Sequence, residues 1–287
     1  MNEQKYSIKN NKSFIPKHIF DCGQCFRWNV QNDGSYTGII KNGVLNVKED
    51  GNNIIFRGIL DGNIRDICTE YFNLETDYEE IKRNLSAIDD NLKTSISYGS
   101  GIRILKQDLW ETLISFIISA NNNIPRIKSI IERISVKYGN EITWNNEKYH
   151  TFPTVEQLSK ASVADLRGLG LGFRDKRVFE TTQMVLNKDI DLEKIKKEKD
   201  VNKIREMLEE FPGVGDKVAD CIMLFALNRF EVFPVDVWVR RVMNELYIKQ
   251  EDEKRVNKEQ IRKLAQEKYS NLAGIAQQYL FYWKRDA

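Results

Sequence analysis

The sequence predicts an α+β protein that is mostly helical, with an N-terminal antiparallel sheet-plus-helix subdomain followed by a helical body. Two observations support this prediction: strand-like alternation with hairpin turns lies before residue 60, and helical periodicity follows it. The chain has 287 residues, of which 41% are apolar and 30% charged, as in globular proteins with more than one subdomain. We expect the sheet subdomain to cover residues 1–100 and the helical body to cover residues 101–287.

The strand signals are concentrated in one short part of the chain. Apolar side chains alternate over residues 36–40, and the dipeptide Asn42-Gly43 that follows is a strong hairpin-turn signal. A second turn signal is Asp50-Gly51, and a short apolar stretch follows each turn. We therefore expect a small, twisted antiparallel sheet.

From about residue 61 the apolar residues recur at helical spacing. Asp77 and Asp108 each stand three residues before a glutamate, which is a capping pattern for a helix start. We expect the helices before Gly99 to pack on the sheet. The segment 109–118 is apolar almost all round, so it should lie buried at the centre. No strand-like alternation follows residue 100, and we expect only helices there.

Charge and cysteine content set limits on location and partners. The net charge of +2 neither requires nor excludes a polyanionic partner. No apolar run reaches the length of a membrane span and no secretory signal is evident, so a cytoplasmic location is the expectation. Cys22 and Cys25 form a C-x-x-C pair, but a metal site needs about four ligands and no second pair exists. We expect buried thiols in a reduced protein.

Residues 211–217 form a glycine-rich segment between an acidic amphipathic helix, 201–210, and an apolar helix. Pro212 and Gly213 suit a tight turn, and Gly215 allows another backbone to approach closely. Free amides at a helix N-terminus bind phosphate without a basic side chain, which would permit DNA binding at a low net charge. The spacing alone leaves two interpretations open: a phosphate-binding hairpin, and an ordinary turn between two helices.

Six segments resemble one known family. FPGVGDKVADC (211–221) followed by VFPVDVW (232–238) resembles the helix-hairpin-helix Gly-Pro-Asp superfamily of base-excision glycosylases, and within it 8-oxoguanine DNA glycosylases. Four further segments resemble this family in its own order: CGQCFRW (22–28), ISANNNIPRI (118–127), LGLGFR (169–174) and AGIAQQYLF (273–281). The resemblance implies a glycosylase body with its helix-hairpin-helix at 203–227. It also implies a bifunctional base-excision repair enzyme, a DNA glycosylase with AP lyase activity that removes 8-oxoguanine from duplex DNA.

The resemblance makes Lys217 and Asp236 the catalytic residues. Lys217 would attack C1′ of the flipped nucleotide, and the resulting Schiff base would permit strand cleavage by β-elimination. A free lysine has a pKa of about 10.4, so a lysine nucleophile near neutral pH needs surroundings that favour the neutral amine. Asp236 precedes an apolar helix, where it would both cap the helix and stabilise positive charge that develops on the sugar.

For base recognition the resemblance implies four residues. The backbone carbonyl of Gly23 would accept the N7 hydrogen that only the oxidised guanine has. Cys221 and Phe281 would sandwich the flipped base, and Gln277 would bind its Watson–Crick edge. Core packing for Cys221 and Phe281, a turn for Gly23 and a solvated amide for Gln277 are the alternative interpretations.

A second group would fill the gap and contact the partner base: Asn121, Arg126, Phe173 and Arg174. Phosphate contact or an exposed charge is the alternative for the two arginines. Two departures from the family pattern bear on this group. Trp238 stands where animal relatives have a phosphate-contacting histidine, and Pro125 replaces a smaller residue next to Arg126. We therefore expect a weaker preference for cytosine opposite the lesion than in animal relatives.

The resemblance also implies ligands of the hairpin. Its phosphate-binding residues would be Gly213, Val214 and Gly215, and the carbonyls of Glu209, Phe211 and Val214 would hold a structural cation. No cofactor is expected to be required, and no iron–sulfur cluster is expected because Cys221 is the one cysteine in the C-terminal half. The expected partner is double-stranded DNA containing oxidised guanine, bound by a monomer.

Two other functions remain open at this stage. An alkylated-base or mismatch glycosylase on the same scaffold would fit most of the matched segments, although a monofunctional alkyl-base enzyme would not need Lys217. A non-catalytic helix-hairpin-helix DNA-binding protein would account for the hairpin. It would account neither for the pairing of Lys217 with Asp236 nor for the pocket residues.

Overall fold

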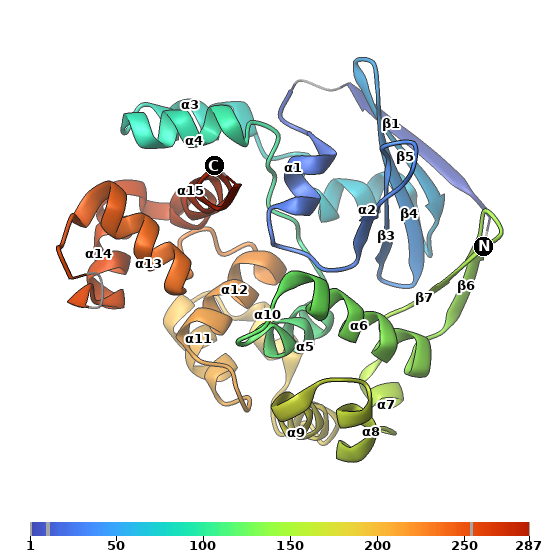
Figure 1. The fold of residues 1–287 in the computed structure, drawn as a ribbon. Helices are drawn as coiled ribbons and strands as arrows, with labels where there is room; N and C mark the ends of the chain where they lie inside the picture. Colours follow the sequence, from blue (N-terminus) through green and yellow to red (C-terminus); the bar gives the residue numbers. More distant parts are fainter. Residues whose placement is uncertain (1, 10–11, 253–254, 287) are drawn as a thin grey trace.

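The computed structural model describes residues 2–9, 12–252 and 255–286 (Figure 1). A five-stranded antiparallel sheet stands at one end of the molecule, and helices make up most of the rest. Its strands lie in the order β1-β5-β4-β3-β2. Their bounds are β1 (Gln4–Lys9), β2 (Trp28–Val30), β3 (Tyr36–Ile40), β4 (Gly43–Asp50) and β5 (Asn53–Ile59). The predicted sheet and the mostly helical α+β class are confirmed.

One face of the sheet is covered by α1 (Pro16–Asp21) and α2 (Ile64–Tyr71). The core between them is aromatic. Phe20 of α1 stacks on Trp28 at 4.0 Å between ring centroids, and Phe14, Phe56 and Phe72 pack around this pair. The Trp28 indole N–H donates a hydrogen bond to the Tyr71 hydroxyl at 2.9 Å, so the one polar atom of the indole is satisfied in the core.

Local signals placed these turns to within one residue. The β3–β4 loop consists of residues 41–42, one position before the predicted Asn42-Gly43, and Lys41 has the positive φ of 52°. The β4–β5 loop consists of residues 51–52, one position after the predicted pair. Gly43 lies in a strand instead, where a Cβ would come within 2.3 Å of the Ile59 carbonyl.

The remaining elements are mostly helices. Their bounds are α3 (Tyr78–Ser86), α4 (Asp90–Tyr98), α5 (Leu109–Ser119), α6 (Ile124–Tyr138), α7 (Val155–Leu158), α8 (Val163–Gly168), α9 (Asp175–Leu186), α10 (Leu192–Lys197), α11 (Val201–Glu209), α12 (Asp216–Leu227), α13 (Val237–Met243), α14 (Lys258–Tyr269) and α15 (Ala273–Asp286). Short turns of 3-10 helix lie at Gly172–Arg174 and Ser270–Leu272, and a π-helical turn lies at Asn244–Ile248. The predicted caps are present: Asp77 and Asp108 accept hydrogen bonds from the amides of Glu80 and Glu111.

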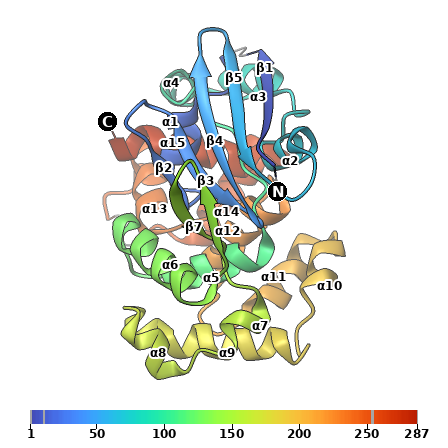
Figure 2. The ribbon, with the colours of Figure 1, turned by 90° about the vertical axis from the view of Figure 1, so that its right-hand side faces the viewer.

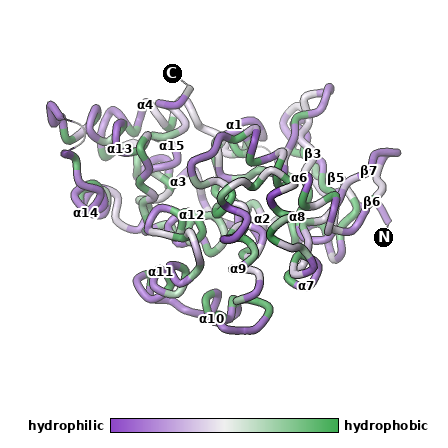
Figure 3. The backbone as a smooth tube through the Cα atoms, turned by 60° about the horizontal axis from the view of Figure 1, so that its bottom comes forward, coloured by the Kyte–Doolittle hydropathy of each residue, from purple (hydrophilic) through white to green (hydrophobic). Residues whose placement is uncertain are grey.

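The helical core is centred on α5 and α12, which pack against each other. The predicted burial of the segment that forms α5 is confirmed: Glu111 and Ser119 are half-buried, and its other residues are buried. Figure 3 shows the apolar parts of the chain gathered inside and the polar parts on the outer turns. None of the described helices combines the length and the apolar character that a membrane crossing requires.

Two sequence-based expectations are wrong. The helices α3 and α4 do not pack on the sheet: Tyr78, Leu85 and Leu92 belong to the helical core, and α4 packs against α15. A second sheet follows residue 100, the hairpin of β6 (Glu141–Trp144) and β7 (Glu147–His150). It extends from the helical body to the main sheet, where Trp144 packs with residues of β3 and β4 (Figure 2).

Gly38 of β3 pairs with Trp28, and a Cβ at this position would lie 2.3 Å from the buried indole. We predict that Gly38→Ala lowers the free energy of unfolding by about 1–3 kcal/mol, because the indole is held by Phe20 and Tyr71 and has no room to shift. Urea unfolding followed by circular dichroism measures this. The matched control is Gly168→Ala at the end of α8, where the added methyl group meets open space. A similar loss in both variants would contradict the prediction.

Candidate active site

The hairpin joins α11 to α12 through residues 210–215. Phe211 is buried, Gly213 has a φ of +86°, and the Val214 amide donates to the Phe211 carbonyl at 3.0 Å. Gly215 caps α12 and has no side chain that could bond to the first amides of the helix. These amides point out of the N-terminus of a twelve-residue helix and can bind an anion. The Val214 amide is used inside the turn.

A buried carboxylate fixes α12 in place. Asp220 is fully buried and accepts hydrogen bonds from Arg205 of α11 at 2.9 Å and from Arg262 of α14 at 2.8 Å. Arg262 also lies 3.4 Å from the Asp216 carboxylate at the start of α12. Because both arginines meet at Asp220, they hold the first turn of α12, which carries Lys217, against α11 and α14.

Next to this turn lies a small cavity of about 60 Å³. It is lined by residues from five separate parts of the chain: Gly23, Phe116, Lys217, Cys221, Phe225, Pro234, Asp236, Val239, Gln277, Gln278 and Phe281. The structure therefore brings together both residues that the resemblance makes catalytic and all four that it assigns to the base. Phe116 of α5 was not identified from the sequence, where it reads only as a core position.

Lys217 and Asp236 face this cavity from different helices. The Lys217 Nζ lies 5.5 Å from the centroid of the Phe116 ring. Asp236 is the N-cap of α13, and its Oδ1 accepts a hydrogen bond from the Val239 amide at 2.8 Å. Capping fixes the carboxylate beside the cavity. Burial raises the pKa of the Cys221 thiol to about 11, an effect that the nearby charge of Lys217 opposes, so Cys221 is a neutral thiol in this wall.

The opposite wall joins the ends of the described chain. Gly23 has a φ of +89°, and a Cβ there would lie 3.5 Å from the Phe281 ring. The neighbouring carbonyls are bonded to α15: Cys22 accepts from Gln278 at 2.6 Å and Asp21 accepts from Arg285 at 2.7 Å. This docking places Gln277, which is 6% exposed, at the cavity.

Gln277 has an unusual environment for a buried amide. Its Oε1 is buried and has no hydrogen-bond partner among the described residues. An orphaned buried acceptor costs free energy in the unliganded protein, and such atoms in a cavity wall indicate a ligand that donates to them. The side chain is therefore poised to accept from a bound molecule.

The cysteine pair near Gly23 has no exposed thiolate. Cys22 and Cys25 are free and buried, as expected, and burial raises the pKa of the Cys22 thiol to about 12. Among the described residues, no three His, Cys, Asp or Glu side chains are grouped so that they could hold a metal ion.

The residues predicted to meet the partner base lie outside this cavity. Asn121 follows α5 with a φ of +51°, and Arg126 and the 54%-exposed Phe173 face solvent. Arg174 is different, since it is 2% exposed. Its guanidinium donates to the carbonyls of Ala120, Asn121 and Leu171. In this conformation Arg174 supports the turn that carries Asn121.

Trp238, the first departure from the family pattern, lies on the surface beside Asp236. Trp238 is 49% exposed and its neighbour Val237 is 54% exposed. The Arg241 guanidinium lies 5.8 Å from the Trp238 ring centroid. Pro125, the second departure, occupies the first turn of α6, which suits a proline.

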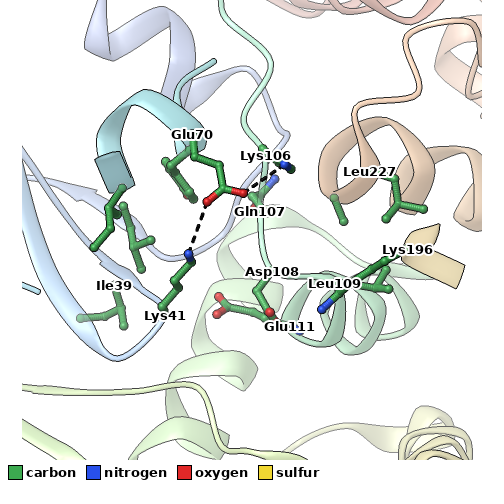
Figure 4. Close-up of a pocket in the computed structure, with 14 residues that line it drawn as sticks. Ile39, Lys41, Glu70, Lys106, Gln107, Asp108, Leu109, Glu111, Lys196 and Leu227 are labelled. Atoms are coloured by element: carbon green, nitrogen blue, oxygen red, sulfur yellow. Dashed lines mark hydrogen bonds and ion pairs between the residues drawn. The ribbon is translucent and has the colours of Figure 1, made fainter. Parts of the chain in front are cut away.

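A roomier cavity of about 380 Å³ lies at the other ends of α5 and α12 (Figure 4). Its lysines are engaged: Lys106 and Lys41 lie 3.0 and 3.5 Å from Glu70. Burial and the neighbouring Asp108 raise the pKa of the Glu111 carboxyl to about 7, and Arg27 opposes the shift. Neither Lys217 nor Asp236 lines this cavity, so the candidate active site is the smaller one.

Comparison with known proteins agrees with this geometry. Residues 114–271 match the family model of the HhH-GPD superfamily base excision DNA repair protein, and residues 7–113 match the 8-oxoguanine DNA glycosylase N-terminal domain. Fold and site thus define a base-excision glycosylase of the helix-hairpin-helix class. Within this class the chain belongs to the 8-oxoguanine DNA glycosylase/lyase family and is a bifunctional N-glycosylase/DNA lyase.

Two relatives, one of them known in two structures, illustrate the similarity. Clostridium acetobutylicum 8-oxoguanine glycosylase/lyase in its apo-form is 43% identical, with a TM-score of 0.91 and 98% of both chains covered. Its complex with double-stranded DNA containing cytosine opposite 8-oxoguanine is 42% identical, with a TM-score of 0.93 and 99% and 97% coverage. The N-glycosylase/DNA lyase of Saccharomyces cerevisiae is 34% identical over 262 residues, which is 83% of this chain and 69% of the yeast protein.

The raised pKa of Glu111, which lines the larger cavity, can be tested through its effect on stability. Its carboxyl has a pKa of about 7 in the folded protein, above the ordinary value of 4.5, so the folded state binds the proton more tightly than the unfolded state. Stability is therefore lost as pH rises through this window. We predict that Glu111→Gln raises Tm relative to the parent protein at pH 8, and that the gain nearly disappears at pH 5. Thermal unfolding at both pH values measures this, with the exposed Glu180→Gln as control. An equal gain at both pH values would refute the assignment.

Proposed function

We propose that this glycosylase/lyase flips 8-oxoguanine out of duplex DNA into the small cavity and removes it with Lys217. The observation that carries the proposal is the convergence of Lys217, Asp236, Cys221, Gln277 and Phe281 on one cavity, together with the turn at Gly23. The function that this arrangement supports best is cleavage of the glycosidic bond of the damaged nucleotide, followed by cleavage of the DNA strand.

The chemistry requires a neutral amine at Lys217. Its Nζ attacks C1′ of the flipped nucleotide, and the C1′–N9 bond breaks with its electron pair, which leaves on the base as the base takes up a proton. The amine nitrogen then loses a proton. The C1′–O4′ bond breaks with its electron pair as O4′ takes up a proton, and the nitrogen lone pair completes the C=N bond of a Schiff base between Lys217 and C1′. Loss of a C2′ proton expels the 3′ phosphate and cuts the strand. Asp236 stabilises the positive charge that develops on the sugar during base departure.

The walls of the cavity account for recognition of the oxidised base. The Gly23 carbonyl accepts the N7 hydrogen of 8-oxoguanine, the orphaned Gln277 Oε1 accepts from the Watson–Crick edge, and Cys221 and Phe281 cover the two faces. A cavity of about 60 Å³ has room for a few water molecules only. Entry of a purine therefore requires the cavity to widen.

Around the lesion the hairpin holds the backbone. The amides of Gly213, Gly215 and the first turn of α12 bind phosphate, whereas Val214 contributes through the shape of the turn. We also propose the cation at the carbonyls of Glu209, Phe211 and Val214. The Phe211 carbonyl already accepts the Val214 amide, so it would bind a cation through its second lone pair. The bond-breaking steps use side chains alone and need no cofactor.

On the other strand, Phe173 enters the stack while Asn121 and Arg126 donate to cytosine. Arg174 holds the Asn121 turn from below. A bidentate contact to a base is worth about 1–3 kcal/mol of discrimination. Since Arg126 alone of the two arginines faces solvent, the discrimination lies at the lower end of this range.

Opposite-base preference is therefore predicted to be mild. Single-turnover excision of 8-oxoguanine should be fastest opposite cytosine, but by only about fivefold over the other bases, which corresponds to about 1 kcal/mol. Arg126→Ala should remove most of this difference. Strict dependence on cytosine would contradict the prediction.

The central test is covalent trapping. Incubation of the protein with an 8-oxoguanine:cytosine duplex and sodium borohydride should reduce the Schiff base to a stable adduct that is visible on a gel. Lys217→Gln should lose the adduct, because among the described residues that line the cavity no other carries an amine. The control Lys93→Gln, an exposed lysine on α4, should retain it.

The outcomes separate the alternatives. Base release without an adduct would keep the glycosylase and remove Lys217 as the covalent catalyst. Absence of both from the parent protein, with DNA still bound, would favour a non-catalytic binding protein. Release of alkylated bases in preference to 8-oxoguanine would indicate an alkylated-base glycosylase on this scaffold.

A further inference from the structure

Arg177, in the first turn of α9, connects the two elements that the proposed function assigns to DNA. Toward the hairpin, its side chain covers Gly213: a Cβ built there would lie 2.5 Å from the Arg177 Cδ and 3.1 Å from its Nε and Nη1. Toward the partner strand, its guanidinium carbon lies 5.3 Å from the centroid of the Phe173 ring. One side chain thus contacts both the phosphate-binding turn and the aromatic wedge.

Nothing in the described part of the chain neutralises this guanidinium. It has no hydrogen bond or ion pair there, although it is half-buried. The adjacent carboxylate, Asp175, is engaged by Arg167 at 2.6 Å. A cation in the first turn of a helix is also repelled by the helix dipole, so the helix itself does not favour an arginine here.

Like charges gather around the same place. Burial lowers the pKa of Arg174, and the neighbouring positive charges of Arg126 and Arg177 lower it further. These three side chains form a positive group on a protein whose net charge is only +2. Such a concentration of charge, with no ion pair to it among the described residues, is typical of a surface that binds phosphates.

Gly213 is part of the same arrangement. Its φ of +86° already favours glycine. The Arg177 side chain also occupies the space that a side chain at position 213 would need. A residue with a side chain at 213 would push Arg177 away from the hairpin. The turn and the arginine are therefore built to fit together.

We propose that Arg177 binds a backbone phosphate next to those held by the hairpin amides, and that it couples capture of this phosphate to insertion of Phe173. The proposal rests on the proposed function, since it takes the hairpin and Phe173 to be DNA contacts. Arg177 is a positioning residue for the wedge and touches no reacting atom.

The first experiment measures DNA affinity as a function of salt. The probe is a duplex carrying a tetrahydrofuran abasic-site analogue opposite cytosine, and the variants are Arg177→Gln and Arg177→Lys. Loss of one phosphate contact should lower the slope of log K against log salt by about one and weaken binding by roughly tenfold at low salt. Arg177→Lys should restore the slope, because the charge returns, but only part of the affinity, because lysine lacks the planar fork. Arg65→Gln, an exposed arginine on α2, is the matched control and should behave like the parent protein.

The second experiment measures coupling to the wedge. A 2-aminopurine next to the lesion reports unstacking by its fluorescence, and Phe173→Ala, Arg177→Gln and the double variant complete a cycle. The combined loss should be smaller than the product of the single losses, since both side chains act in one step. Multiplicative losses would overturn the coupling, and a parent-like salt slope in Arg177→Gln would overturn the phosphate contact. In either case the borohydride adduct of the parent protein would still report on the proposed function separately.

Discussion

The catalytic side of the molecule depends on one buried carboxylate. Asp220 lies in the helical core, where an unpaired charge would be strongly destabilising, so it requires both Arg205 and Arg262. These partners come from α11 and α14, and α12 is consequently locked to both. Lys217 and Cys221 stand on either side of this anchor along α12. The ion pairs of Asp220 lie outside the cavity, yet by fixing α12 they fix where the Lys217 amine and the Cys221 thiol lie in its wall.

A buried charged residue also fixes the residues proposed to meet the partner strand. Arg174 donates to carbonyls of the turn after α5, and this leaves Asn121, Arg126 and Phe173 exposed to solvent. Arg177 and the free amides of the hairpin lie together on a protein whose net charge is only +2. Under the proposed function, a few well-placed phosphate contacts take the place of a strongly positive surface.

Much of this could be predicted from the sequence where the signal is local. The caps at Asp77 and Asp108 and the two hairpin turns depend on residues within a few positions of one another, and each was placed to within a residue. The short helix α1 and the hairpin β6–β7 were missed because elements of four to six residues are too short to show a clear hydrophobic period. The packing of α4 on α15 was missed because only the complete fold brings these helices together.

The same distinction applies to the site. The Lys217 and Asp236 positions follow from contiguous motifs, whereas the roles of Asp220, Arg177 and Phe116 depend on contacts between separate helices, which a single sequence does not reveal.

The docking of α15 on the turn at residues 21–23 has a consequence for biosynthesis. Gly23 leaves the ribosome long before Gln277, Gln278 and Phe281, which emerge after Lys217 and all of the hairpin. A nascent chain that has released the sheet and the hairpin therefore still lacks one wall of the cavity. The complete cavity can form only once α15 has been translated.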